Sequence, residues 1–134
     1  MGHREDMIEV IMAAYAARAA GNVEGLVAAF HPEGAFTLVG DKSALELTGR
    51  VQGHQALREA FGQFIANFDF LKRDILSDLV EGQRAAVQSR VLVRYRPTGN
   101  NWETDILDLF RFQDGKIVEL TEFADTAQVK AMIS

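Results

Sequence analysis

The clearest pattern of hydrophobic and polar positions runs from Trp102 to Asp125, WETDILDLFRFQDGKIVELTEFAD. Apolar and polar residues alternate there with the two-residue period of a β-strand, and QDGK in the middle is typical of a tight turn. The pattern predicts two antiparallel strands, 101–113 and 116–124. One side of the first strand carries Trp102, Thr104, Ile106, Asp108, Phe110 and Phe112.

Asp108 is the one acid in that mostly apolar, aromatic row. An ionised carboxylate removed from water is costly unless it is paired. We therefore expect Asp108 to have a partner, to stay hydrated or to hold its proton. This position is the first hint of a pocket.

The spacing of apolar residues predicts three helices before the long strands. The first runs from Arg4 to about Ala20 and ends at Gly21, and Asn22 caps a short second helix that continues through Phe30. The third begins at Gly53, and its apolar stripe consists of Leu57, Phe61, Phe64, Ile65 and Phe68.

Six extended segments and a last short helix complete the predicted elements. The strands are expected at 35–40, about 45–48, 70–80, 84–96, 101–113 and 116–124, and the helix, capped by Asp125, at 127–133. Helices first and long strands last predict an α+β fold, with the helices on one face of a curved antiparallel sheet. Three helices cannot seal a strongly bent sheet, so we expect a cavity at its open end.

Composition narrows the functional classes. At 134 residues and 48% hydrophobic residues, we expect one domain, 1–134. A net charge of -5 argues against nucleic acid and anionic membrane surfaces as partners. The absence of cysteines excludes disulfides and thiolate sites, and three dispersed histidines predict no metal site. Without an apolar leader or spanning run, we expect a cytoplasmic protein.

Three stretches in order, AAGNVEGLVAAFHPEGAF, GHQALREAF and DLFRFQDGKIVELTEFAD, resemble the NTF2-like superfamily in its SnoaL-like and ketosteroid-isomerase-like branch. They resemble its first helix pair leading into a strand, its third helix and its C-terminal hairpin. The resemblance implies a cone-shaped fold, a homodimer formed through the outer sheet face, a small hydrophobic ligand and no cofactor. It leaves the reaction open, because this fold carries isomerases, cyclases, dehydratases, epoxide hydrolases and members without chemistry.

The resemblance also implies roles for single residues. In ketosteroid isomerases an acid of the last hairpin donates a hydrogen bond to the developing enolate, and Asp108 in LDLFRF matches its position. The tyrosine of the family's first helix falls on Ala14, one residue before Tyr15. The position of the general base falls on 38–40, where the nearest carboxylate is Asp41.

The epoxide-hydrolase branch offers a second comparison through the PTG turn of this chain. Its Asp-Arg-Asp set needs an arginine and an aspartate on the strand before that turn, where this sequence has Ser89 and Val91. Asp125 alone matches. The sequence therefore disfavours epoxide hydrolysis.

We accordingly expect an isomerase or cyclase that applies acid/base chemistry to a carbonyl substrate, with Asp108 and Tyr15 as catalytic candidates. The candidate ligand-binding residues are Trp102, Ile106, Phe110, Phe61, Phe64, Glu122 and Asp125. For Asp108 the alternative is a structural ion pair, for Asp125 a helix cap, and for Glu122 a solvated strand position. If Glu122 and Asp108 both point inward, one of the two must keep a proton. The alternative functions are a non-catalytic ligand-binding module and a dimerisation or accessory domain.

Overall fold

The computed structural model describes residues 3–134. Its helices are α1 (His3–Ala20), α2 (Val23–Ala28), α3 (His54–Asn67) and α4 (Thr126–Ile133). Gly21 ends α1 with a left-handed φ of 72°, which glycine adopts without a steric penalty. The side chain of Asn22 accepts a hydrogen bond from the amide of Gly25 and caps α2. The side chain of Asp125 accepts one from the amide of Gln128 and caps α4, so both predicted caps are confirmed.

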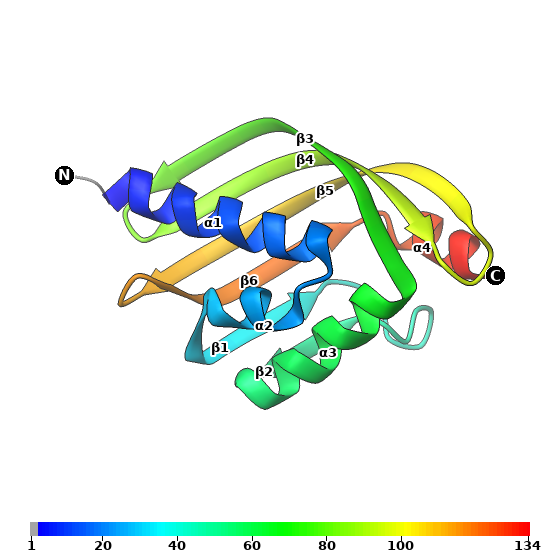
Figure 1. The fold of residues 1–134 in the computed structure, drawn as a ribbon, viewed down its shortest axis with the longest axis horizontal. Helices are drawn as coiled ribbons and strands as arrows, with labels where there is room; N and C mark the ends of the chain where they lie inside the picture. Colours follow the sequence, from blue (N-terminus) through cyan, green and yellow to red (C-terminus); the bar gives the residue numbers. More distant parts are fainter. Residues whose placement is uncertain (1–2) are drawn as a thin grey trace.

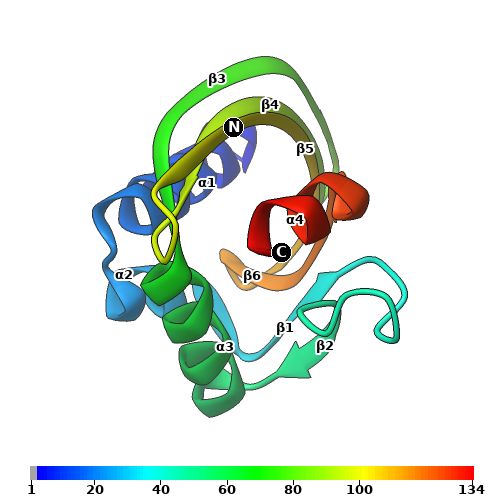
Figure 2. The ribbon, with the colours of Figure 1, turned by 90° about the vertical axis from the view of Figure 1, so that its right-hand side faces the viewer.

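The strands form one curved sheet in the order β2-β1-β6-β5-β4-β3. Their bounds are β1 (Phe30–Leu38), β2 (Gly49–Gln52), β3 (Phe68–Glu81), β4 (Arg84–Tyr95), β5 (Asn100–Gln113) and β6 (Lys116–Ala124). Figures 1 and 2 show α1, α2 and α3 along one side of this sheet, which confirms the predicted α+β architecture. One pairing differs from the expected antiparallel sheet, because β1 lies parallel to β6.

The first two predicted strands are displaced along the chain. No strand covers 45–48, because Asp41 organises a turn there: its backbone carbonyl accepts hydrogen bonds from the amides of Ala44 and Leu45, and its carboxylate binds Ser43. Strand β2 follows that turn. Strand β1 starts at Phe30, whereas the sequence pattern predicts that the second helix continues through this residue.

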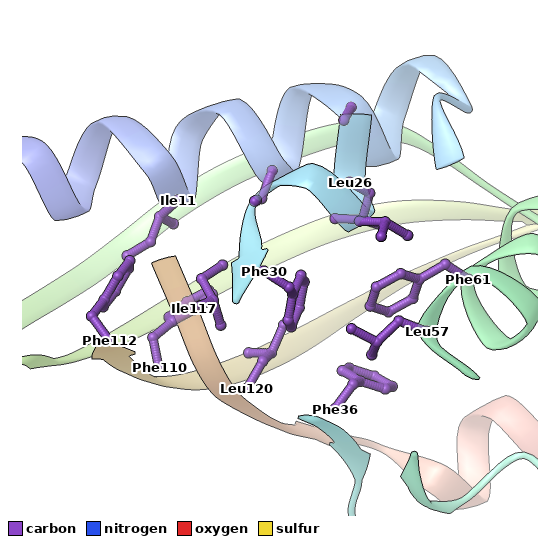
Figure 3. Close-up of a cluster of buried hydrophobic side chains, with 14 of the residues drawn as sticks. Ile11, Leu26, Phe30, Phe36, Leu57, Phe61, Phe110, Phe112, Ile117 and Leu120 are labelled. Atoms are coloured by element: carbon purple, nitrogen blue, oxygen red, sulfur yellow. The ribbon is translucent and has the colours of Figure 1, made fainter. Parts of the chain in front are cut away.

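The main core lies between the helices and the inner face of the sheet (Figure 3). Ile11 of α1, Phe30 of β1 and Leu57 of α3 are almost fully buried in it. The inner face of β4 is also buried, at Val87, Ser89, Val91 and Val93.

Helix α4 lies at the end of the sheet that the first three helices leave uncovered (Figures 1 and 2). Its buried residue Met132 packs with Phe68, Val91, Val93 and Ile106 in a second apolar cluster. Helix α4 therefore covers the end of the sheet where the sequence predicts an opening. Within residues 3–134, no helix is long and apolar enough to cross a membrane.

Candidate functional site

A cavity of about 120 Å³ lies between the helices and the inner face of the sheet. Aromatic and aliphatic side chains from α1, α3, α4 and the long strands make up most of its wall. The polar side chains at the wall are Tyr15, Arg18, Arg73, Thr104, Asp108 and Glu122. An engineered apolar cavity of roughly 150 Å³ holds benzene, so this space suits a ligand built on a small ring.

Tyr15 of α1 and Asp108 of β5 meet at this wall. The Tyr15 hydroxyl donates a hydrogen bond of 2.7 Å to Oδ2 of Asp108. Only 1% of the Asp108 surface is exposed, so the carboxyl group is removed from solvent. The side chains that the resemblance paired are in contact, although Tyr15 stands one position from the family's tyrosine and buried Ala14 occupies that position.

Glu122 of β6 stands directly opposite Asp108 of β5 in the antiparallel pairing, and both line the cavity. Oδ1 of Asp108 is buried, and no fixed donor among the described residues reaches it. A protonated Glu122 carboxyl supplies the missing donor, because a neutral carboxyl carries one O–H. This arrangement favours the inward-facing acid pair over the solvated alternative for Glu122.

Burial raises the pKa of both acids. Desolvation is the largest cause for Glu122, and the charge of Asp108 and their mutual hydrogen bond raise the Glu122 pKa further. Desolvation also raises the pKa of Asp108, but hydrogen bonds from Glu122 and Tyr15 and the charge of Arg73 oppose that rise. The hydrogen bond from Tyr15 and the nearby Arg73 guanidinium both favour the negative charge on Asp108 and therefore the proton on Glu122. Burial and the Asp108 charge also raise the pKa of Tyr15, so its hydroxyl stays a donor.

Two arginines complete the polar wall, and the sequence analysis did not assign either to the site. Nη1 of Arg73 lies 4.0 Å from Oδ2 of Asp108, and the Arg73 guanidinium stacks 3.6 Å from the centre of the Tyr15 ring. Arg18 lines the same cavity, and desolvation lowers its pKa to about 10. The spacing of Ile11, Tyr15 and Arg18 along α1 was a usable signal, because residues four and seven apart share a helix face.

The predicted ligand-binding residues divide into two groups. The cavity wall includes Ile106, Phe110, Phe61, Phe64 and Glu122. Trp102 and Asp125 are outside it: Trp102 packs on the second apolar cluster, and Asp125 is the exposed cap of α4. Asp41, the carboxylate nearest to the expected base position, also lies outside in its turn.

No group of three metal-ligating side chains occurs among residues 3–134. The polar atoms at the cavity are carboxyl, phenol, hydroxyl and guanidinium groups. Guanidinium and phenol groups donate hydrogen bonds, and neutral carboxyl groups donate as well as accept. This set suits proton transfer to and from an organic oxygen.

Comparison with known families and structures gives a consistent assignment. The sequence model of the SnoaL-like domain matches residues 11–120. No curated protein sequence matches the chain closely enough to count as a relative. The fold, by contrast, matches many solved structures.

Three solved structures illustrate the fold. A candidate polyketide cyclase from Xanthomonas campestris is 19% identical, with a TM-score of 0.83 over 98% of this chain and 99% of the other. TerC, crystallised with polyporic acid, is 21% identical, with a TM-score of 0.83 over 96% and 98%. An epoxide hydrolase of the LEH-like type from M. tuberculosis is 15% identical, with a TM-score of 0.75 over 96% and 90%. At these identities the likeness is one of fold.

Proposed function

The chain belongs to the SnoaL-like domain family of the NTF2-like superfamily, and from this premise we propose that it is an acid/base enzyme acting on a small hydrophobic carbonyl compound. The observation that carries the proposal is the pairing of Asp108 with Glu122 across two strands at an apolar cavity. Two carboxyl groups that share a proton in a dry site act at neutral pH as one weak acid.

Glu122 is the member of the pair that touches the substrate in this proposal. It is half-buried, whereas Asp108, at the same cavity wall, is almost fully buried. Glu122 gives its proton to the carbonyl oxygen, and the resulting Glu122 carboxylate removes a proton from the α-carbon. The products are an enol and a protonated Glu122. If the enol is conjugated with a second double bond, Glu122 gives its proton to the far carbon and takes back the enol hydroxyl proton, which completes an isomerisation. If the enol carbon attacks a second carbonyl, Glu122 gives its proton to that carbonyl oxygen and takes back the enol hydroxyl proton, which completes a cyclisation.

Asp108 and Tyr15 act through Glu122 and are positioning residues. Asp108 accepts hydrogen bonds from Tyr15 and from the neutral Glu122, which fixes the orientation of the Glu122 carboxyl group. The negative charge of Asp108 opposes ionisation of Glu122 and so keeps it an acid at neutral pH. Arg73, 4.0 Å from Asp108, stabilises the charge that remains after Glu122 gives up its proton.

The test is exchange of α-protons for deuterium, followed by NMR on a panel of enolisable hydrophobic ketones and 1,3-diketones. General acid/base groups contribute about 10²–10⁴-fold, so Glu122→Gln should slow exchange by about a hundredfold or more. The matched control is Glu103→Gln, which makes the same change at an exposed position of β5. Equal exchange by wild type and Glu122→Gln would remove Glu122 from the chemistry.

Asp108→Asn separates positioning from direct participation. It removes the negative charge beside Glu122, so the pH profile of exchange should move to lower pH while part of the activity remains. An unchanged profile would contradict the positioning role. Binding of hydrophobic carbonyl compounds without any exchange would leave the second candidate function, a ligand-binding module.

We also propose that two copies of this single domain associate through the outer face of the sheet in the cytoplasm. Leu107 and Phe123 are adjacent across β5 and β6 on that face, and each is about 40% exposed, as is Leu109. The apolar surface continues from Leu109 of β5 to Ala86 of β4 and then to Leu79 of β3. An apolar surface that crosses four strands is typical of a subunit interface.

A further inference from the structure

Two positively charged side chains share one aromatic ring at the cavity wall. The guanidinium carbon of Arg18, from α1, lies 4.1 Å from the centre of the Phe70 ring, and that of Arg73, from β3, lies 5.5 Å from it. The charge of Arg73 helps to lower the pKa of Arg18, so the two guanidinium groups repel each other. Such repulsion is stronger where water is excluded. An anion bound beside both groups would relieve the repulsion.

Both arginines have hydrogen-bond donors to spare. Nη2 of Arg18 donates to the backbone carbonyls of Phe64 and Phe68, at 3.4 and 2.9 Å. Nη1 of Arg73 donates to Oγ of Ser89 at 2.9 Å. A guanidinium carries five N–H donors. Within residues 3–134, the remaining N–H groups of Arg18 and Arg73 bind no acceptor. Both side chains line the cavity.

The acids of the cavity do not balance these two charges. Asp108 and Glu122 face each other across β5 and β6 and share a proton, which leaves the pair with a single negative charge. Asp69 is the other acid that acts on Arg18, but its carboxylate binds Arg94 and Arg96 at 2.9 Å. The cavity therefore keeps a positive excess inside an otherwise apolar wall.

We propose that the cavity binds a hydrophobic anion, an aromatic or aliphatic molecule whose carboxylate or ionised enol accepts hydrogen bonds from Arg18 and Arg73. Its apolar body packs against walls such as Phe61, Phe64 and Ile106. The inference rests on the ligand cavity of the proposed function and narrows its substrate class. A carbonyl compound anchored by an acidic group at the arginines would present its carbonyl oxygen to Glu122.

Wild-type protein gives the first test, because this test needs no substitution. The probes are benzoate and its uncharged isostere benzamide, titrated at neutral pH into the full chain and followed through the amide signals of the protein by NMR. Hydrogen bonds to charged groups lead us to expect about tenfold or greater preference for the anion. Equal affinities, tighter binding of the amide, or no binding of either probe would overturn the proposal.

Arginine variants give the second test. Arg18→Gln and Arg73→Gln should each weaken benzoate binding by about tenfold to a hundredfold and weaken benzamide binding much less, because the amide carries no charge. Arg90→Gln is the matched control, because Arg90 is exposed and pairs with Asp105 on β4 and β5. Arg18→Lys and Arg73→Lys retain the charge and should recover part of the loss. An equal loss for both probes, or no loss, would count against the arginine site.

The two proposals fail in distinguishable ways. Glu122-dependent exchange on neutral ketones, without preference for benzoate, would retain the enzyme and remove the anion site. A clear preference for benzoate without any exchange would retain the anion site and remove the chemistry.

Discussion

The hydroxyl of Tyr15 donates a 2.7 Å hydrogen bond to Oδ2 of Asp108, joining α1 to β5 inside the domain. Arg73 adds a second link, because it stacks on the Tyr15 ring and lies 4.0 Å from the same oxygen. One carboxylate oxygen thus connects the helical layer, β5 and β3. Helix α1 is positioned over the sheet at the site of the proposed chemistry.

Tyr15→Phe should lower the free energy of unfolding by about 1.5–3 kcal/mol, because it removes a hydrogen bond to a charged, buried acceptor. Tyr95→Phe is the matched control: Tyr95 packs on Phe68, and its hydroxyl binds no described side chain, so the expected loss is small. Urea denaturation of the three proteins measures the difference. Equal losses in the two variants would mean that the bond to Asp108 contributes nothing to stability.

How far the sequence predicts this site depends on strand regularity. Alternation along β5 predicts that Asp108 faces inward, and the structure confirms this. The two-residue period holds there because β5 pairs with β4 without an irregularity. Strand β3 has shifts in register between Phe70 and Lys72 and between Ile75 and Ser77. Each shift exchanges the two faces of the strand, so the inward position of Arg73 could not be read from a two-residue period.

Glu122 was ambiguous for a different reason. Its neighbour Phe123 is apolar but lies on the outer face, where it is 40% exposed. An apolar residue on the outer face makes both faces of β6 equally suitable for burial, and sequence alone cannot choose between them. If the outer face is a subunit interface, the ambiguity has a physical origin, because both faces of the strand are then buried.

That interface can be tested at Leu109. Leu109→Asp places a charge in the centre of the exposed apolar surface and should dissociate the proposed dimer, because an ionised carboxylate is costly to bury. Sedimentation equilibrium measures the change in mass. Met12→Asp is the control, since Met12 is similarly exposed at 36% but lies on α1. A wild-type protein that remains monomeric at high concentration would exclude the interface.

Two buried threonines allow a comparison of a paired with an unpaired hydroxyl. Oγ1 of Thr48 donates to the carbonyl of Leu45 at 2.8 Å, whereas Oγ1 of Thr104, at the cavity wall, has no partner among the described residues. Thr48→Val should therefore destabilise the protein by about 1 kcal/mol, and Thr104→Val should be neutral or stabilising. Thermal denaturation of both variants measures the difference. A destabilising Thr104→Val would show that its hydroxyl has a partner, such as a bound water molecule.

The raised pKa of Glu122 predicts an unusual dependence of stability on pH. In the folded protein Glu122 keeps its proton well above its ordinary pKa of 4.5, so the folded state binds more protons than the unfolded chain above that pH. The favourable contribution is fully present below 4.5 and is lost as the pH rises through the folded pKa. Asp108 has the same sign. Arg73, Arg18 and Tyr15 also face Glu122. The pKa of Arg18 falls only to about 10 and that of Tyr15 is raised, so neither group adds a slope in this range.

Glu122→Gln should flatten this slope and raise the free energy of unfolding at pH 8 relative to wild type. Three other acids have lowered pKa values: Glu24, Asp41 and Asp69. Their contributions to the free energy of unfolding change with pH in the opposite direction and at lower pH, outside a series measured from pH 5 to 8. Glu103→Gln, at an exposed position, should retain the wild-type slope. Urea denaturation across the series measures all three proteins. If Glu122→Gln retains the full slope, Glu122 does not hold the proton of the pair, and the acid in the proposed mechanism would have to be Asp108.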